Sequence, residues 1–206
     1  MRKTLCTVVC AGMLAACNTT PPKPENVKSK SFLDLFQPIA PAAMTGNVFK
    51  LVGQDFTVIT AGTELNYNSM TASWGGWGVL FNEPTTWCIL RANRYTLEFI
   101  RKENLYTMCY FDDQYKDQVM LFGSASGRNS DKMKNHTLTA VETPEGSIAY
   151  KEAKLIIECE LTEITTVSPD DFYSADARTF ITEAHAEAHD YHKLVFGKIA
   201  KAWVRK

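Results

Sequence analysis

The stretch NYNSMTASWGGWGVLFNEP, Asn66–Pro84, has a composition unlike that of an ordinary core strand or an ordinary turn. Its small and hydroxyl side chains let a ligand lie close to backbone amides, and Trp74 and Trp77 offer flat apolar faces. The glycines beside them permit backbone conformations that side chains would forbid. The stretch therefore predicts a site for a flat ligand. The alternative is a hairpin corner of a purely structural β protein, in which the indole rings plug the core.

Composition indicates one ordinary globular domain. The chain has 206 residues, of which 45% are hydrophobic and 11% aromatic, with a formal net charge of −1. This length is sufficient for one real core. Since there is neither a basic excess nor a clustered Lys/Arg face, no nucleic acid is expected as a partner.

The first residues have the pattern of a targeting signal. Arg2 and Lys3 precede an apolar run, Leu5–Ala16, that is too short to span a bilayer. The sequence Leu-Ala-Ala-Cys that ends at Cys17 resembles the bacterial lipobox, where cleavage before the cysteine is followed by its acylation. Residues 1–16 are therefore predicted to be a lipoprotein signal peptide, and lipids on Cys17 to anchor the protein to a membrane. A plain secretory signal with a coincidental cysteine is the alternative.

A tether and a single domain are expected after the signal peptide. Residues 17–31 are polar and Pro-rich, which predicts a flexible tether, and residues 32–206 form the globular domain. The predicted location is the bacterial cell envelope, outside the inner membrane. The remaining thiols, Cys88, Cys109 and Cys159, are odd in number and lie in apolar runs, so we expect buried core residues and no disulfide framework.

The pattern of β-branched and aromatic runs predicts a mainly β domain with inserted helices, an α+β fold resembling a barrel. Strands are predicted at Phe56–Ala61, Thr85–Leu90, Leu105–Phe111, Leu155–Leu161 and Leu194–Val204. Helices are predicted at Thr96–Glu103 and Gln114–Phe122, with a third short helix near Ser130 or Asp131.

Four segments, in this order, carry a resemblance to a known family. They are YNSMTASWGGWGVLFNEP (Tyr67–Pro84), RANRYTLEFI (Arg91–Ile100), SASGRNSDK (Ser124–Lys132) and DYHKLVFGKI (Asp190–Ile199). Together they resemble the flavin reductase-like family, close to its flavoredoxin branch, over nearly all of the chain from about residue 48. The resemblance implies an FMN-binding split β-barrel, electron transfer through noncovalent FMN, and a homodimer.

The resemblance also implies site residues. It places four consecutive residues along the isoalloxazine ring: Thr71, Ala72, Ser73 and Trp74. Arg91, Arg94 and Thr96 match the family's phosphate-proximal motif, which agrees with the ability of a guanidinium to form a bidentate pair with a phosphate. The alternative for the two arginines is that they are solvated cations beside a helix.

A second polar cluster matches the family pattern SGR followed by DK. It consists of Ser126, Gly127, Arg128 and Lys132, and Lys132 is expected to reach a phosphate or ribityl chain. A plain cap between a loop and a helix explains the serines and Asp131 equally well.

The histidine-rich stretch EAHAEAHDYH, Glu183–His192, suggests a rival site. His185 and His189 are four residues apart, and His192 with Glu187 or Asp190 would complete a metal site. No complete ligand signature is present, so no metal is predicted. His192 is instead a candidate for a residue close to the flavin, where it would tune reduction.

Function is predicted only in outline. The chain is expected to be an FMN-dependent oxidoreductase with an unknown redox partner, but a lipoprotein outside the inner membrane has no evident access to NAD(P)H. The Gly75–Gly78 run lacks the spacing of a dinucleotide fingerprint. Alternatives are an extracytoplasmic flavin electron carrier or flavin-binding module without its own reductase activity, and a structural or ligand-binding lipoprotein on the same barrel.

Overall fold

The structure is a computed structural model that describes residues 32–130, 132–185 and 190–206. The predicted signal peptide, Cys17 and the tether lie outside these residues. Within the described part of the chain, no helix is both long enough and apolar enough to cross a membrane.

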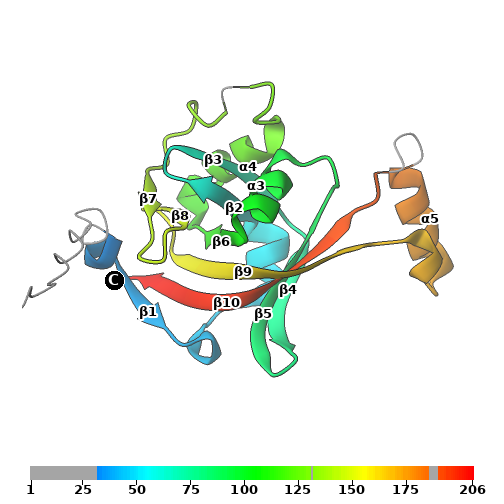
Figure 1. Ribbon diagram of the computed structural model, residues 1–206, viewed down its shortest axis with the longest axis horizontal. Coiled ribbons are helices and arrows are strands. Elements are labelled where there is room, and N and C mark those ends of the chain that lie inside the picture. The colour runs from blue at the N-terminus through cyan, green and yellow to red at the C-terminus, as the bar shows by residue number, and fades with distance from the viewer. Residues whose placement is uncertain (1–31, 131, 186–189) are drawn as a thin grey trace, which may run out of the picture.

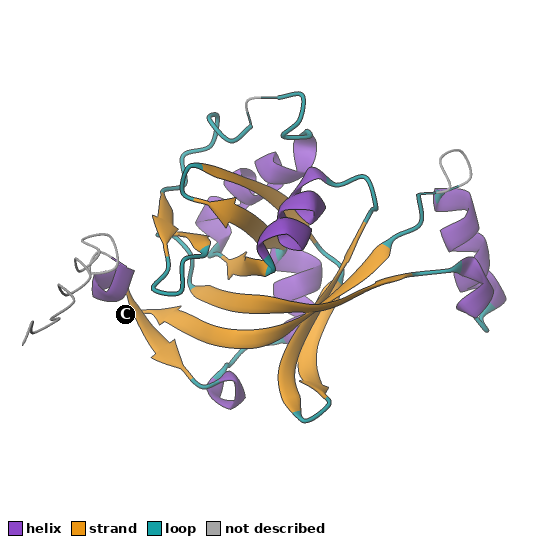
Figure 2. Cartoon of the chain, viewed as in Figure 1, coloured by secondary structure: helices purple, strands orange, loops and turns teal. Residues whose placement is uncertain are grey.

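One antiparallel sheet of eight strands forms the body of the protein (Figures 1 and 2). Its order is β3-β2-β6-β9-β10-β5-β4, and β1 pairs with β10. The strands are β1 (Phe36–Ile39), β2 (Thr57–Thr63), β3 (Asn66–Ala72), β4 (Gly75–Leu80), β5 (Glu83–Leu90), β6 (Leu105–Tyr110), β9 (Leu155–Thr166) and β10 (Lys193–Arg205). A second sheet pairs β7 (Ala140–Glu142) with β8 (Ile148–Tyr150).

The sheet curls into an incomplete barrel. β3 and β4 stand at opposite ends of the strand order, yet only Ser73 and Trp74 separate them in sequence. Since two residues span only about 7 Å, the two ends of the sheet must approach each other at this link. The stretch Asn66–Pro84 therefore lies where the barrel is split.

Two long strands continue beyond the barrel. β9 and β10 extend as a two-stranded arm that carries α5 (Ala175–Ala184) at its far end (Figure 1). Their pairing shifts register at Phe196/Gly197 and at Ile199/Lys201, and such bulges bend and twist a strand. At the first of these positions a side chain would collide with the barrel, because a Cβ on Gly197 would lie 2.3 Å from the Tyr106 hydroxyl.

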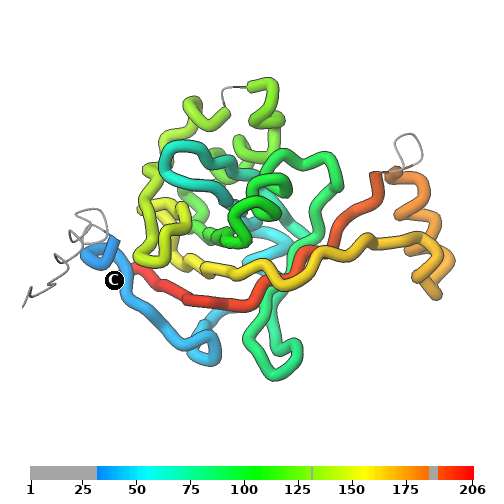
Figure 3. Tube along the Cα trace, viewed as in Figure 1, coloured from blue at the N-terminus to red at the C-terminus, as the bar shows by residue number. Residues whose placement is uncertain are grey.

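Helices cover one side of the barrel. α3 (Tyr95–Glu103) packs against β2 and β3, and α4 (Lys116–Ser124) packs against β3. α3 buries Leu97 and Ile100 and ends at Asn104, which adopts a left-handed conformation (φ 57°). The short helical segments are Pro41–Ala43, α2 (Val48–Lys50), Leu51–Asp55, Asp113–Tyr115 and Pro169–Asp171. The first and last described strands lie side by side, since β1 pairs with the end of β10 (Figure 3).

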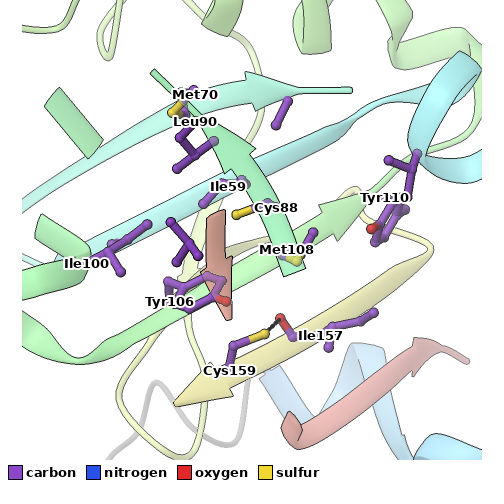
Figure 4. Packing of buried hydrophobic residues seen from close by; sticks show 14 of the residues in the cluster. Ile59, Met70, Cys88, Leu90, Ile100, Tyr106, Met108, Tyr110, Ile157 and Cys159 are labelled. Atoms are coloured by element: carbon purple, nitrogen blue, oxygen red, sulfur yellow. Dashed lines mark hydrogen bonds between the residues drawn. The ribbon is translucent and has the colours of Figure 1, made fainter. Parts of the chain in front are cut away.

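The core is apolar and includes the three thiols. Cys88 and Cys159 lie in the cluster inside the barrel with Ile59 and Met108 (Figure 4). Cys109 lies in a second cluster between the barrel and α4. Burial raises the pKa of the Cys109 and Cys159 thiols to about 12 and that of Cys88 further still. The expectation that these cysteines are buried core residues is therefore confirmed.

The mainly β architecture with inserted helices is confirmed, and two local expectations are corrected. The Asn66–Pro84 stretch was expected to differ from an ordinary strand, yet it supplies β3 and β4. Its glycines leave room for an indole ring, since a Cβ on Gly76 would lie 2.8 Å from the ring of Trp87. The third helix near Ser130 does not form in the described residues, where 127–130 and 132–135 are turns and bends. α5 was not predicted.

Candidate functional site

A basic cleft lies between β3, the start of α3, the end of α4 and the loop that follows it. Its volume is about 260 Å³. It is lined by Asn68, Met70, Thr71, Asn93, Arg94, Tyr95, Thr96, Phe122, Gly123, Ala125, Ser126, Gly127, Arg128 and Lys132. Three cationic side chains thus share one small cleft.

Lys132 is the most buried of these cations. It is 5% exposed, and its Nζ donates a hydrogen bond to the carbonyl oxygen of Phe122 at 2.9 Å. Among the residues that the structure describes, no carboxylate pairs with it. Burial and, to a lesser degree, the like charge of Arg94 lower the pKa of Lys132 to about 8. A buried cation is costly without a counter-charge, so this environment suits an anionic ligand.

Arg94 and Thr96 bring the start of α3 to the same cleft. Arg94 is the N-cap residue, and its exposed guanidinium makes no hydrogen bond or ion pair with a described residue. The hydroxyl of Thr96 accepts a hydrogen bond from Asn68 Nδ2 at 2.7 Å, so its own proton is left to donate. The first backbone N–H groups of a helix lack intrahelical partners and favour anions.

The loop of Ser126–Arg128 forms the rim of the cleft. Arg128 is ion-paired with Glu98 and lies over the ring of Tyr95, with 4.7 Å between Cζ and the ring centre. Gly127 fits closely, because a Cβ there would lie 2.1 Å from Oδ1 of Asn68. The Ser126 carbonyl accepts a hydrogen bond from the Ser130 hydroxyl at 2.8 Å. Arg128 and the serines therefore hold the loop, as the capping alternative supposed, although no helix follows.

A second cavity, the tryptophan hollow, adjoins the cleft at the split in the barrel. Its volume is about 170 Å³. It is lined by Met70, Thr71, Ala72, Ser73, Trp74, Ile89, Leu90, Arg91, Arg94 and His192. Met70, Thr71 and Arg94 line both, so the cleft and the hollow are adjacent. Every residue predicted to bind the cofactor lines one or both of them.

Local contacts fix the floor and wall of the tryptophan hollow. The hydroxyl of Thr71 donates to the Val119 carbonyl, and the Trp74 carbonyl accepts from the Ile89 N–H at 3.0 Å. The ring of Trp74 lies 5.1 Å from that of His192 and is 42% exposed. An apolar groove that includes Phe56 and Met120 borders Thr71–Ser73 on the other side.

His192 is connected to the segment expected to be a metal site. Nε2 of His185 lies 2.6 Å from Nδ1 of His192, and Nδ1 of His185 lies 3.1 Å from Oδ1 of Asp190. Burial, His185 and Arg91 lower the pKa of His192 to about 4, while the hydrogen bond with His185 lowers the pKa of Asp190. His189 and Glu187 lie outside the described residues. Within the described ones, no group of three ligating side chains is arranged for a metal.

Two features of the site were not predicted. Asn68 donates a hydrogen bond to Thr96 and lies against Gly127, and it belongs to the stretch singled out from the sequence. The hydrogen bonds of His185 were missed because its spacing from His189 suggested a metal. His192, which was predicted to lie close to the flavin, lines the tryptophan hollow.

Comparison with known proteins agrees with this geometry. The model of the family described as "Flavin reductase like domain" matches residues 49–206. No curated protein matches the chain. Similar solved structures include an FMN-binding protein from Thermus thermophilus (20% identity, TM-score 0.56, 78% of each chain covered). A flavoredoxin from Methanosarcina acetivorans has 18% identity and a TM-score of 0.55, with 82% of this chain and 75% of that one covered. The predicted split-barrel fold is thereby confirmed.

Proposed function

Because this chain belongs to the flavin reductase-like domain family, we propose that it binds FMN noncovalently and acts as an oxidoreductase that transfers electrons through it. The observation that carries the proposal is that the basic cleft and the tryptophan hollow are adjacent and share three lining residues. One end suits an anion and the other suits a flat ring, which are the two ends of FMN. Similar folds described as FMN-binding proteins and flavoredoxins support the choice.

The phosphate is assigned to the basic cleft. Lys132 is buried there with only a neutral carbonyl as partner among the described residues, and Arg94 is near enough to lower its pKa. A phosphate between them would neutralise both charges and accept charge-assisted hydrogen bonds. Thr96 and the first N–H groups of α3 would add further donors. These groups fit a phosphate and would not be needed for riboflavin.

The isoalloxazine ring is assigned to the run Thr71–Trp74. The small side chains of Ala72 and Ser73 leave the backbone of the β3–β4 link accessible, and the exposed Trp74 offers an apolar face. FMN would supply the redox chemistry, while the protein supplies binding, orientation and electrostatic tuning. His192 would lie at the edge of the ring site.

Export, membrane attachment and dimerisation are parts of the same proposal. The lipobox-like sequence ending at Cys17 supports a lipid anchor in the cell envelope. The exposed aromatic residues Tyr173 and Phe180 on the arm of β9 and β10 support a homodimer, since such side chains commonly pack against a partner. Sedimentation of wild-type protein and of Tyr173→Asp tests the dimer, because Tyr173 is fully exposed whereas the ring of Phe180 lies 6.1 Å from that of Trp74.

A second candidate is a flavin electron carrier or flavin-binding module without its own NAD(P)H reductase activity. The lipobox-like sequence favours it, because NAD(P)H is a cytosolic pool. Bleaching of bound flavin by NADH or NADPH is expected of a reductase. Reduction by dithionite or a partner protein alone is expected of a carrier.

The first experiment is a visible absorption spectrum of the purified protein after incubation with FMN and desalting. We expect a retained flavin spectrum; a colourless protein would contradict the proposal. Arg94→Ala should weaken FMN binding by about tenfold to a hundredfold, because the lost contact is charge-assisted. Riboflavin binding should change little, and an equal loss for both flavins would refute the phosphate assignment.

A further inference from the structure

Asp190, His185 and His192 form a continuous chain of hydrogen bonds that ends at the tryptophan hollow. Both ring nitrogens of His185 are used within it, with Nδ1 3.1 Å from Asp190 and Nε2 2.6 Å from Nδ1 of His192. The side chain of His185 has no exposed surface, while His192 is 7% exposed and lines the hollow. Nε2 of His192 is therefore the ring nitrogen of this chain left to contact a molecule in the hollow.

The chain of hydrogen bonds has a direction. A carboxylate only accepts hydrogen bonds, so Nδ1 of His185 carries a proton. When His185 is neutral, its Nε2 has none and accepts the hydrogen bond from Nδ1 of His192. A neutral His192 then has an unprotonated Nε2. In this state the chain presents a proton acceptor, not a donor, to the hollow.

We propose that Asp190, His185 and His192 are a proton relay that takes up a proton from the hollow and holds it on His185. An N–H bond forms at Nε2 of His192 as an N–H or O–H bond of the molecule in the hollow breaks, and that molecule keeps the electron pair of the broken bond. The N–H bond at Nδ1 of His192 then breaks as another forms at Nε2 of His185, and the positive charge rests beside the carboxylate of Asp190. No electrons move in these steps. The reverse sequence returns the proton to the hollow.

The surrounding charges favour His185 over His192 as the place where the proton is held. Burial, His185 and Arg91 lower the pKa of His192 to about 4, and Arg94 acts in the same direction. The hydrogen bond from His185 and the charge of Arg91 lower the pKa of Asp190, so it is ionised at neutral pH. Tyr191, whose ring lies 5.4 Å from that of His185, is a further titratable group on this segment.

The relay rests on the proposed function in one respect, namely that redox chemistry takes place in the tryptophan hollow. Two-electron chemistry of a flavin is accompanied by protons, which groups that line the ring site can receive or release. His192 contacts the hollow directly. His185 and Asp190 act through His192 and are positioning residues.

The positions of the protons in the relay are tested first, by ¹⁵N NMR of labelled histidines in the flavin-free, full-length protein. We expect His192 to carry its proton on Nδ1 while the pair is neutral. Asp190→Asn should lower the proton affinity of the histidine pair about tenfold, because an opposite charge within hydrogen-bond distance shifts a titration by about one pH unit or more. Asp190→Glu should restore the proton affinity of the pair. His136→Gln should leave the signals of His185 and His192 unchanged. A His192 proton on Nε2 of the neutral pair, or a midpoint unmoved in Asp190→Asn, would overturn the relay.

The second test is the midpoint potential of bound FMN as a function of pH. We expect the plot to bend where the histidine pair titrates, and the bend to move about one pH unit lower in Asp190→Asn and to return in Asp190→Glu. A bend that does not move would overturn the relay even though FMN binds. A protein that binds no FMN would refute the proposed function, and the flavin-free NMR measurement would still decide the relay.

Discussion

The basic cleft and the tryptophan hollow adjoin each other, yet they differ in whether their titratable side chains have a charged partner within the protein. In the cleft, neither Lys132 nor Arg94 has an anionic partner among the described residues. In the hollow, His192 belongs to a chain that already ends in the carboxylate of Asp190. The cleft thus lacks a counter-charge that a ligand would supply, whereas the histidine pair at the hollow already has one in Asp190. We therefore expect the hollow to select by shape. FMN and riboflavin differ only in the phosphate, so a comparison of their affinities separates the contribution of the cleft from that of the hollow.

The largest effect is expected at the cleft from Lys132→Met. This change keeps most of the buried volume and removes the charge, so FMN affinity should fall by about 2–3 kcal/mol, or roughly 30- to 150-fold. Riboflavin affinity should change by less than about threefold. Fluorescence titration measures both. Lys134→Met, at an exposed lysine two residues away, is the matched control, and equal losses for the two flavins would remove the distinction between cleft and hollow.

Gly127→Ala tests how closely the separate segments of the cleft fit. The new Cβ would lie 2.1 Å from Oδ1 of Asn68, which must move away from Thr96. We expect the free energy of unfolding to fall by about 1–3 kcal/mol, the usual cost of overpacking. Urea unfolding measures it. Gly53→Ala is the control because nothing lies within 4 Å of its Cβ, and a stable Gly127→Ala protein would show that the cleft adapts.

A pH dependence of FMN affinity is expected from the cleft. The pKa of Lys132 in the free protein is lowered to about 8, so its ammonium loses its proton as the pH rises through 8. A phosphate binds the protonated form, and FMN affinity should fall about tenfold between about pH 7.5 and 9.5. Riboflavin affinity should stay level over this range. Titrations of Lys132→Met provide the control, since its FMN-to-riboflavin ratio should not vary with pH.

The smallest effect is expected at the hollow from Trp74→Ala. Loss of the aromatic face should weaken FMN and riboflavin equally, by about 1 kcal/mol or roughly fivefold. Phe81→Ala, at an 86% exposed position in the turn between β4 and β5, should change neither affinity. If Trp74→Ala weakened the binding of FMN but not that of riboflavin, Trp74 would act on the phosphate and not on the isoalloxazine ring.

Five of the strands and the helices α3 and α4 could be predicted because their signals are local. The apolar runs at β2, β5, β6, β9 and β10 alternate or cluster as strands do, and α3 has an apolar stripe. The run of Asn66–Pro84 was harder to assign. Its glycines disfavour a strand by themselves, and the strand is stabilised by the ring of Trp87 on the neighbouring β5.

Residue types and motif order were enough to nominate Thr71–Trp74, Arg94 and Lys132. The side-chain chemistry of a residue and its place in a motif can both be read from the sequence. Tertiary structure decided which of them share a cavity, since the cleft joins β3, α3 and the loop after α4 across long stretches of chain. It also showed that Arg128 is engaged by Glu98, whereas Lys132 is buried without a carboxylate among the described residues. The burial and the ion pairing of these cations depend on segments distant in sequence, so they could be learned only from the fold.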